Sequence, residues 1–340
     1  IFTIHAMVVG TDTVSTSICD SCHHTQLVEW KDSGHGGPGG LTIEEFNDEH
    51  YATSSSCQSC HTSEGFIAAN DPAYADYEFG EEVSFIGCVT CHDPHADTYD
   101  SHQLRNVGAV EVEYHPGLDD DDSDIPAMSG KGNAQTCVQC GYGTGQLCAQ
   151  CHHGRRDSDN VAGQIANGYA HMGPHHSAQM DMYIGYGSYE VADSTDPELY
   201  TYDREHAHGG ISNACVRCHM VRETELHGTI QDHSFHTFEP TVDNCAGCHD
   251  GITDFDVNGG MTAITDKMDE LAGLFGYADY VTFEEEWDSR ADGVETWQRE
   301  AAYALYFLIG DGSHGVHNPD YAMDLLQNAI DYYTAMSGAN

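Results

Sequence analysis

The chain has 340 residues and is strongly acidic, with 11 Lys and Arg against 56 Asp and Glu and a formal net charge of −45. This charge disfavours direct binding to nucleic acid or anionic lipid, because both partners would be negative. No stretch approaches the roughly 18 consecutive apolar residues of a membrane-spanning helix, so no membrane span is predicted.

Every one of the 14 cysteines belongs to a Cys-x-x-Cys pair, and six of these pairs are followed directly by histidine. This is the attachment signature of c-type haem. The two thiols add to the haem vinyl groups, and the histidine binds the iron. The predicted thioether cysteines are Cys19, Cys22, Cys57, Cys60, Cys88, Cys91, Cys148, Cys151, Cys215, Cys218, Cys245 and Cys248. The predicted proximal ligands are His23, His61, His92, His152, His219 and His249.

Zinc sites also use Cys-x-x-Cys pairs. Four zinc ligands per site would group the pairs in twos, and zinc does not require a histidine after every second cysteine. A disulfide framework does not require the histidines either. The repeated pattern therefore favours six covalently bound haem c groups, with iron as the metal.

The chain has 24 histidines, so many remain after the six proximal ligands are assigned. They can supply a second axial ligand to each iron, which predicts six bis-histidine haems. His50 and His208 each stand seven residues before the first cysteine of a motif, and His236 stands nine before Cys245. We expect these three to be distal ligands. The alternative is a surface histidine near the haem propionates.

Several other histidines are held in reserve as distal ligands. His24 and His153 directly follow proximal histidines, and adjacent side chains point apart, so such a pair could serve two stacked haems. His95 lies three residues beyond His92. A solvated or propionate-bonded histidine remains the alternative for each of them. His5, near the start of the chain, could reach a neighbouring subunit or belong to a disordered end.

Residues 1–255 contain every cysteine and are predicted to form a hexahaem domain. Loops are expected at 34–40 and 113–126, and a short strand at 108–114. The fold expected here is mostly irregular and loop-rich, wrapped around a stacked haem array, with few short strands. The acidic segment at 119–124 could bind calcium through carboxylate oxygens. It lacks an EF-hand pattern, which favours a solvated loop.

Residues 256–340 are predicted to be a helical region packed on the haem domain, so that α-helices concentrate at the C-terminus. Apolar residues recur at helical spacing from Met261 to Phe275 and again from Trp297 to Leu308. A third helix is predicted within 317–336. Asn318 can cap it, and Pro319 suits its first turn.

The chain resembles a broad family of secreted multihaem c-type cytochromes. The resemblance rests on "WKDSGH", "CQSCHTSEGF", "CVTCHDPH", "CAQCHHGRR", "PHHSAQ", "CVRCHM", "HTF" and "DGSHGVHNPDYAMDLLQNAI". By length and motif number it is most similar to hexahaem outer-surface cytochromes that polymerise into extracellular filaments. The resemblance implies electron transfer, and axial roles for His35, His175 or His176, His236 and His317.

The pair Cys137 and Cys140 is followed by Gly141, which cannot bind iron. We expect a disulfide there, because two thiols in an oxidising compartment tend to pair. Related reductases often replace the motif histidine with lysine, and no Cys-x-x-Cys-Lys occurs here. That departure favours an electron carrier over an enzyme.

Covalent haem is attached outside the bacterial or archaeal cytoplasm, and the chain begins without an initiator Met. We therefore expect a mature secreted protein, located outside the cell or at its surface, or alternatively in the periplasm. The expected partners are further copies of the chain in a head-to-tail homopolymer, other redox proteins, and acceptors such as minerals or electrodes. The alternatives are a monomeric periplasmic electron shuttle and a nitrite- or hydroxylamine-type oxidoreductase.

Overall fold

The structure is a computed structural model whose contacts divide the chain into two compact units. It describes residues 14–36, 43–70, 83–93, 103–108, 110, 113–114, 143–193, 195–196, 198–226 and 229–338. Unit 1 comprises Ile1–Gly108, Tyr142–Cys151 and Asn213–Asp250. Unit 2 comprises Ala109–Gly141, His152–Ser212 and Gly251–Asn340.

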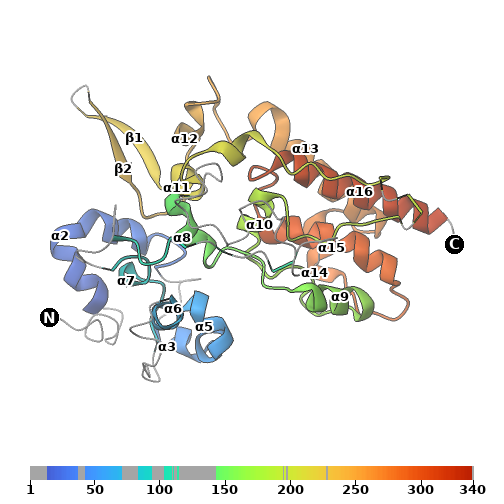
Figure 1. The fold of residues 1–340 in the computed structure, drawn as a ribbon, viewed down its shortest axis with the longest axis horizontal. Coiled ribbons are helices and arrows are strands. Elements are labelled where there is room, and N and C mark those ends of the chain that lie inside the picture. The colour runs from blue at the N-terminus through green and yellow to red at the C-terminus, as the bar shows by residue number, and fades with distance from the viewer. Residues whose placement is uncertain are drawn as a thin grey trace. The chain divides into compact units, whose positions relative to one another are not determined.

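Apart from the 18-residue α2, unit 1 consists of short helices joined by irregular segments (Figure 1). Its helices are α2 (Val14–Lys31), α3 (Ile43–Asp48), α4 (His50–Thr53), α5 (Ser55–His61), α6 (Ser63–Asn70), α7 (Cys88–Cys91), η3 (Gly143–Gly145), α8 (Gln146–Ala149), α11 (Ala214–His219) and α12 (Val242–Ala246). Two strands, β1 (Val221–Leu226) and β2 (Thr229–Ser234), form an antiparallel hairpin. The register runs from Val221 opposite Ser234 to Leu226 opposite Thr229.

One apolar cluster of unit 1 joins α3 to the segment before α7. Phe46 and Phe85 meet edge to face with ring centroids 4.7 Å apart, and Ala52 and Val83 complete the cluster. Polar contacts fix the segment that leads into α7. Trp30 donates from Nε1 to the Ile86 carbonyl at 2.8 Å, and the buried Glu64 accepts from the Ser84 amide at 2.7 Å.

Unit 2 is built on longer helices. They are α9 (Ser158–Asn167), α10 (Gln179–Ile184), η4 (Ala207–Gly210), η5 (Val257–Gly259), α13 (Gly260–Leu274), α14 (Tyr280–Glu286), α15 (Thr296–Asp311) and α16 (Pro319–Gly338). The three helices predicted near the C-terminus correspond to α13, α15 and α16, which are the long orange and red helices of Figure 1. The short helix α14 was not predicted, and Asp279 caps it by accepting from the Thr282 amide at 2.7 Å.

The core of unit 2 lies where α16 packs against α13 and α15. Leu271, Leu305 and Leu326 are fully buried in this cluster. Asn318 caps α16 as predicted, because its Oδ1 accepts from the Tyr321 amide at 3.1 Å. The fully buried Tyr303 of α15 packs on Val161 and completes a second cluster with α9.

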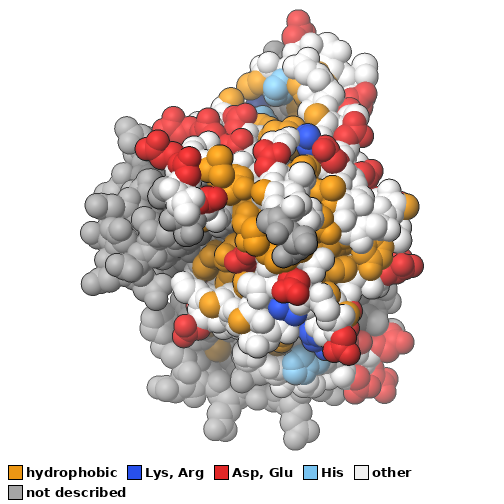
Figure 2. All heavy atoms as spheres, turned by 90° about the vertical axis from the view of Figure 1, so that its right-hand side faces the viewer, with side chains coloured by type: hydrophobic (Ala, Val, Ile, Leu, Met, Phe, Trp, Pro, Cys, Tyr) orange, Lys and Arg blue, Asp and Glu red, His pale blue; other side chains and the backbone are white. Residues whose placement is uncertain are grey.

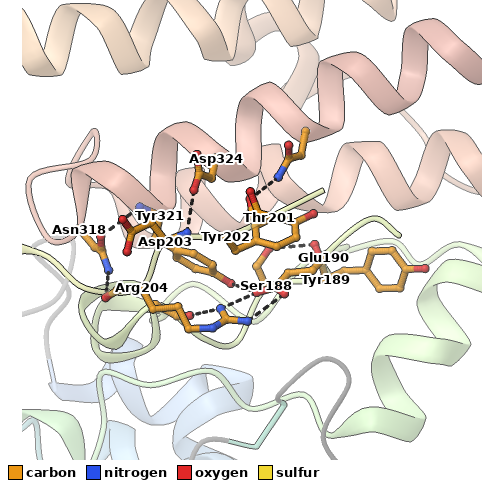
Figure 3. Close-up of polar contacts among 12 residues, drawn as sticks. Ser188, Tyr189, Glu190, Thr201, Tyr202, Asp203, Arg204, Asn318, Tyr321 and Asp324 are labelled. Carbon is orange, nitrogen blue, oxygen red and sulfur yellow. Dashed lines mark hydrogen bonds and ion pairs between the residues drawn. The ribbon is translucent and has the colours of Figure 1, made fainter. Parts of the chain in front are cut away.

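A half-buried ion pair and its hydrogen bonds to Tyr321 and Asn318 tie the segment before η4 to the start of α16 (Figure 3). Arg204 makes a bidentate contact with Glu190 at 2.7 and 3.0 Å, and its guanidinium lies 4.2 Å from the ring centroid of Tyr186. Tyr321 donates to the same Glu190 carboxylate at 2.9 Å, and Asn318 donates to the Arg204 carbonyl at 3.3 Å. Bidentate pairs of this kind hold a fixed geometry. They position the chain just before His208.

The predicted fold class is confirmed: the chain is loop-rich, its helices concentrate at the C-terminus, and strands are few and short. The strand predicted at 108–114 is not formed at its described positions 108, 110, 113 and 114. The observed hairpin lies instead at 221–234, a segment too rich in charged residues to show an apolar alternation. Within the described residues, no helix combines the length and apolar character needed to cross a membrane.

The predicted domain boundary at residue 255 lies close to the point where the chain enters unit 2 for the last time. Unit 2 also takes in residues 152–212, which the prediction placed with the haem domain. These residues join it because α9 and α10 contribute Val161 and Met182 to its buried clusters. Neither helix shows a long enough apolar repeat to signal this from the sequence.

Candidate haem-binding site

Each of the six Cys-x-x-Cys-His motifs begins on a helical turn. Both cysteines lie on the helix in α2, α5, α7 and α11, whereas only the first cysteine lies on α8 and α12 and the second follows in a hydrogen-bonded turn. On a helix, residues three apart lie on one face, so the four complete helices present both of their cysteines to the same side. All twelve of these cysteines are half-buried or exposed. The local geometry therefore suits a group that bonds to both sulfur atoms.

All six cysteine pairs lie in unit 1, and several motifs are in contact there. The Cys19 thiol of the first motif is hydrogen-bonded to the Cys88 thiol of the third. The second and third motifs are linked because Ser63, just after α5, bonds to Thr90 of α7 at 2.6 Å between hydroxyl oxygens. Motifs that are not consecutive in the sequence thus meet in space.

The fourth to sixth motifs are tied to their neighbours as well. The Asn244 side chain, one residue before the sixth motif, donates to the Cys218 carbonyl in the fifth. The Cys60 sulfur of the second motif lies 3.8 Å from the carbonyl oxygen of Gln150 in the fourth. Asn213 accepts a hydrogen bond from the Thr144 amide at 3.1 Å, which joins α11 to the turn preceding α8.

The proximal candidate His219 has a defined ring orientation. Its Nδ1 lies 2.9 Å from the Phe238 carbonyl, which can only accept, so Nδ1 carries the proton. A neutral imidazole protonated at Nδ1 has its lone pair on Nε2. Such a contact is the usual way in which a protein orients a metal-binding histidine.

Phe238 also brings two distal candidates together in unit 1. Its ring centroid lies 4.7 Å from that of His35 and 5.8 Å from that of His236. The His236 ring lies 6.2 Å from the proximal candidate His92, and its amide donates to Glu29 at 3.0 Å. The segment around Phe238 therefore gathers histidines from three parts of the sequence.

The other two distal candidates described in unit 1 are exposed. His50 begins α4, and no contact of its ring connects it to a motif. The reserve candidate His24 lies 2.6 Å from Asp20 on the surface of α2. The structure does not bring either side chain to a second motif.

In unit 2, the distal candidate His208 of η4 contacts the segment just before α16, which contains the distal candidate His317. His208 donates from Nδ1 to the Val316 carbonyl at 2.8 Å. His317, which follows Val316 in the chain, has its Nδ1 2.5 Å from Asp311 Oδ1. Asp311 is buried. Both contacts leave the lone pair of a neutral imidazole on Nε2, as at His219.

The proximal candidate His152 connects to the same region through Gln179. Its Nδ1 lies 3.3 Å from Gln179 Oε1, and the Gln179 amide donates to the carbonyls of Gly310 and Asp311 at 3.1 and 3.2 Å. Asp181 fixes the chain that follows the motif, because its carboxylate accepts from the Gly154 amide at 2.6 Å. Burial raises the pKa of Asp181 to about 7.

His175 and His176 line a cavity of about 300 Å³ in unit 2. Their ring centroids are 6.2 Å apart, and His175 has a φ of 81°, in the left-handed region. Arg156 and Tyr169 also line the cavity, with the guanidinium 5.2 Å from the tyrosine ring centroid. The reserve candidate His153 contacts the residue that follows His176, because its carbonyl accepts from the Ser177 hydroxyl at 3.1 Å.

Some predicted residues lie outside the described part of the chain. These are His5, His95, Cys137, Cys140 and the acidic segment 119–124.

Phe238, Gln179 and Asp311 were not predicted from the sequence. Phe238 and Gln179 each orient a histidine of a distant segment, for which the sequence carries no local signal, whereas Asp311 lies near its partner His317 in the chain. His206 was not predicted either; burial lowers its pKa, and its ring centroid lies 6.2 Å from that of His208.

The family model of cytochrome c552 matches residues 178–338. The outer cell wall cytochrome OcwA gives a TM-score of 0.50 at 19% identity, covering 92% of this chain and 50% of that chain. An undecahaem cytochrome from the S-layer of Carboxydothermus ferrireducens gives 0.51 at 18% identity, covering 94% and 45%. Residues 178–338 therefore resemble a cytochrome family, and the chain shares the fold of these two multihaem cytochromes.

The chain spans about half the length of these two solved structures. A cytochrome c nitrite reductase from Desulfovibrio desulfuricans gives a TM-score of 0.38 at 18% identity, covering 82% of this chain and 64% of that chain. This score is too low to indicate a shared fold. No curated protein matches the chain.

The described residues of the chain fit covalently bound haem c. The helical turns present paired cysteines, and several histidines are held with Nε2 as the nitrogen able to bind iron. Carbonyl and carboxylate partners at Nδ1 are what iron-binding imidazoles require to keep one orientation.

Proposed function

We propose that the chain carries six haem c groups and conducts electrons between them as a subunit of an extracellular filament. The observation that carries the proposal is the contact among motif helices within unit 1, including α2 and α7, where the Cys19 and Cys88 side chains lie next to each other. Haem iron cycles between ferric and ferrous states, so closely spaced haems pass electrons in steps. Contacts between motifs support a continuous path through the unit.

The proposed attachment residues are the twelve motif cysteines, and the proposed proximal ligands are the six histidines that follow them. The proposed distal ligands are His35, His50, His175, His208, His236 and His317, with His5, His24, His95, His153 and His176 in reserve. The oriented rings of His208 and His317 support their place on this list. Bis-histidine ligation and the net charge of −45 both favour ferric iron and low reduction potentials.

The proposal also includes the domain division at residue 255, a disulfide between Cys137 and Cys140, and a calcium ion at 119–124. It further includes an extracellular or cell-surface location. The two solved structures it resembles are described as an outer cell wall cytochrome and an S-layer cytochrome, which supports this placement. Figure 2 shows apolar side chains gathered on one face and bordered by acidic ones, a surface that suits contact with another protein.

A second candidate function is reduction of a small molecule. The cavity lined by Arg156, Tyr169, His175 and His176 favours it, because a cavity with a few convergent polar groups is the usual form of a small-ligand site. A reductase needs at least one haem iron with an open or replaceable ligand. The electron carrier needs none.

Ligand binding to the ferric protein separates the two candidates. If every haem has two histidine ligands, the electron paramagnetic resonance spectrum contains low-spin signals only, and added cyanide or nitrite leaves it unchanged. A high-spin signal equivalent to one haem, lost on addition of nitrite, would establish the reductase instead.

A further inference from the structure

Residues 103–105 form a short segment, here called the strap, that pairs with the third motif. The Asp93 amide donates to the Gln103 carbonyl and the Arg105 amide to the Cys91 carbonyl, both at 2.8 Å. His92 and Leu104 form an isolated antiparallel bridge between these two contacts. The strap therefore lies against the residue proposed as the proximal ligand of the third haem.

The strap places the guanidinium of Arg105 inside the loop of the motif. Its Nε donates to the Val89 carbonyl at 3.0 Å, and its Nη2 donates to the His92 carbonyl at 3.3 Å. In a longer helix, the Val89 carbonyl would accept from the Asp93 amide, which here bonds to Gln103. Arg105 thus satisfies a carbonyl left over at the end of α7.

The charge of Arg105 is buried. Its side chain is 1% exposed, and the Asp93 carboxylate, which is 23% exposed, lies 3.6 Å from Nη2. Among the described residues only one other basic side chain, Arg299 in unit 2, is buried. Arg105 therefore brings a positive charge into the protein interior next to the third motif.

We propose that Arg105 sets the reduction potential of the haem at Cys88 and Cys91, raising it by its buried positive charge. The inference rests on the proposed function, since it requires haem at the third motif. Ferric haem carries one more positive charge than ferrous haem, so a nearby buried cation destabilises the ferric form. Hydrogen bonds and charge around the ligands are recognised means of tuning haem potentials. Arg105 acts through the His92 loop and is therefore a positioning residue.

The consequence is a haem that holds its electron more firmly than it otherwise would. The chain has only 11 basic residues against 56 acidic ones, so an acidic surround lowers every potential. A buried arginine at one motif works against that trend locally. Electrons passing through unit 1 would then rest at the third haem.

The test is a redox titration of purified, haem-loaded variants whose haem number is first checked by intact mass. In Arg105→Met, one of the six midpoint potentials should fall by ~59 mV or more, equivalent to a tenfold change in a one-electron equilibrium constant. Arg105→Lys keeps the charge and should fall less. Asp93→Asn removes the partial counter-charge and should raise the same potential.

Arg290→Met is the matched control, because that arginine is 54% exposed and pairs with a surface carboxylate. Its six potentials should stay unchanged.

Six haems with unchanged potentials in Arg105→Met would overturn the proposal, and so would a fall spread evenly over several haems. If Arg105→Met loses its third haem, the other two variants decide. Unmoved potentials in both Arg105→Lys and Asp93→Asn would then reject the role of the charge. Failure of the proposed function looks different, because the wild-type peptide containing Cys88 and Cys91 would carry no haem mass.

Discussion

The imidazole of His208 donates from Nδ1 to a backbone carbonyl, and its neighbour His317 contacts a buried carboxylate in the same way. At the scale of single residues, these contacts determine which nitrogen can bind iron. The sequence predicted His208 from its distance to a motif and His317 from a resemblance. It could not reveal the Val316 carbonyl, because a hydrogen-bond partner far along the chain from His208 leaves no local pattern, and no motif marks Asp311 as the partner of the nearby His317.

Replacing His208 by Met should turn one of six haems high-spin or raise its potential, since a thioether ligand stabilises ferrous iron relative to imidazole. Absorption and paramagnetic resonance spectra, with a redox titration, provide the measurement. His171→Met is the matched control: His171 is an exposed histidine of the same unit and is not proposed as a ligand. If His208→Met keeps six low-spin haems and six unchanged potentials, His208 is not a ligand.

Asp181 predicts a pH dependence of stability. Burial raises its pKa to about 7, well above the ordinary value near 3.9. The folded protein therefore binds this proton more tightly than the unfolded chain. Its stabilising contribution is complete below about pH 4 and is lost as the pH rises to about 7. The loss is on the order of 4 kcal/mol at most.

Asp181→Asn keeps an acceptor for the Gly154 amide but cannot ionise. In urea unfolding, its stability relative to wild type should increase between pH 4 and pH 7 and then level off. Asp288→Asn is the control, because hydrogen bonding to Arg290 lowers the pKa of this exposed carboxyl. Its effect should have the opposite sign. A difference between Asp181→Asn and wild type that does not vary with pH would refute the prediction.

At the scale of secondary structure, α13, α15 and α16 could be predicted because their apolar residues recur at helical spacing over three or more turns. The motif helices were not predicted as helices, since α7 and α8 are single turns and the 18-residue α2 has only a weak apolar repeat. Helix α14 was missed because it is short, and the hairpin at 221–234 because its charged residues interrupt any apolar alternation. Long regular elements carry their own signal, whereas short ones depend on tertiary contacts.

The packing of α16 predicts where unit 2 is sensitive to mutation. Leu326 is fully buried between helices, so Leu326→Ala should cost about 2–5 kcal/mol of unfolding free energy. Val281→Ala removes apolar atoms at a position that is 46% exposed and should change stability far less. Chemical denaturation of both variants gives the comparison. Equal losses would mean that α16 does not form the core of the unit.

At the scale of the whole molecule, the sequence indicated a multihaem cytochrome from repetition alone, because six copies of one motif leave few other interpretations. The division into two units could not be predicted. The segment 152–212 lacks a long apolar repeat, and its place in unit 2 follows from contacts made by α9 and α10. The order in which motifs meet, such as the first with the third, was likewise beyond the sequence.

Assembly into filaments is a prediction about the whole molecule. A net charge of −45 opposes self-association, so added salt or divalent cations should favour the polymer by screening it. An open polymer requires a head-to-tail contact that does not close into a ring. Electron microscopy of native secreted material, before and after salt and calcium depletion, should show filaments that shorten on depletion. Monodisperse monomers under every condition would favour the shuttle.

The number of covalently attached haems tests the central claim most directly. Intact mass spectrometry of the denatured protein should give the chain plus six haem groups, less two hydrogens for a disulfide between Cys137 and Cys140. Peptide mapping should place each haem on one of the six Cys-x-x-Cys-His motifs. Fewer than six haems, or a seventh on Cys137 and Cys140, would contradict the account.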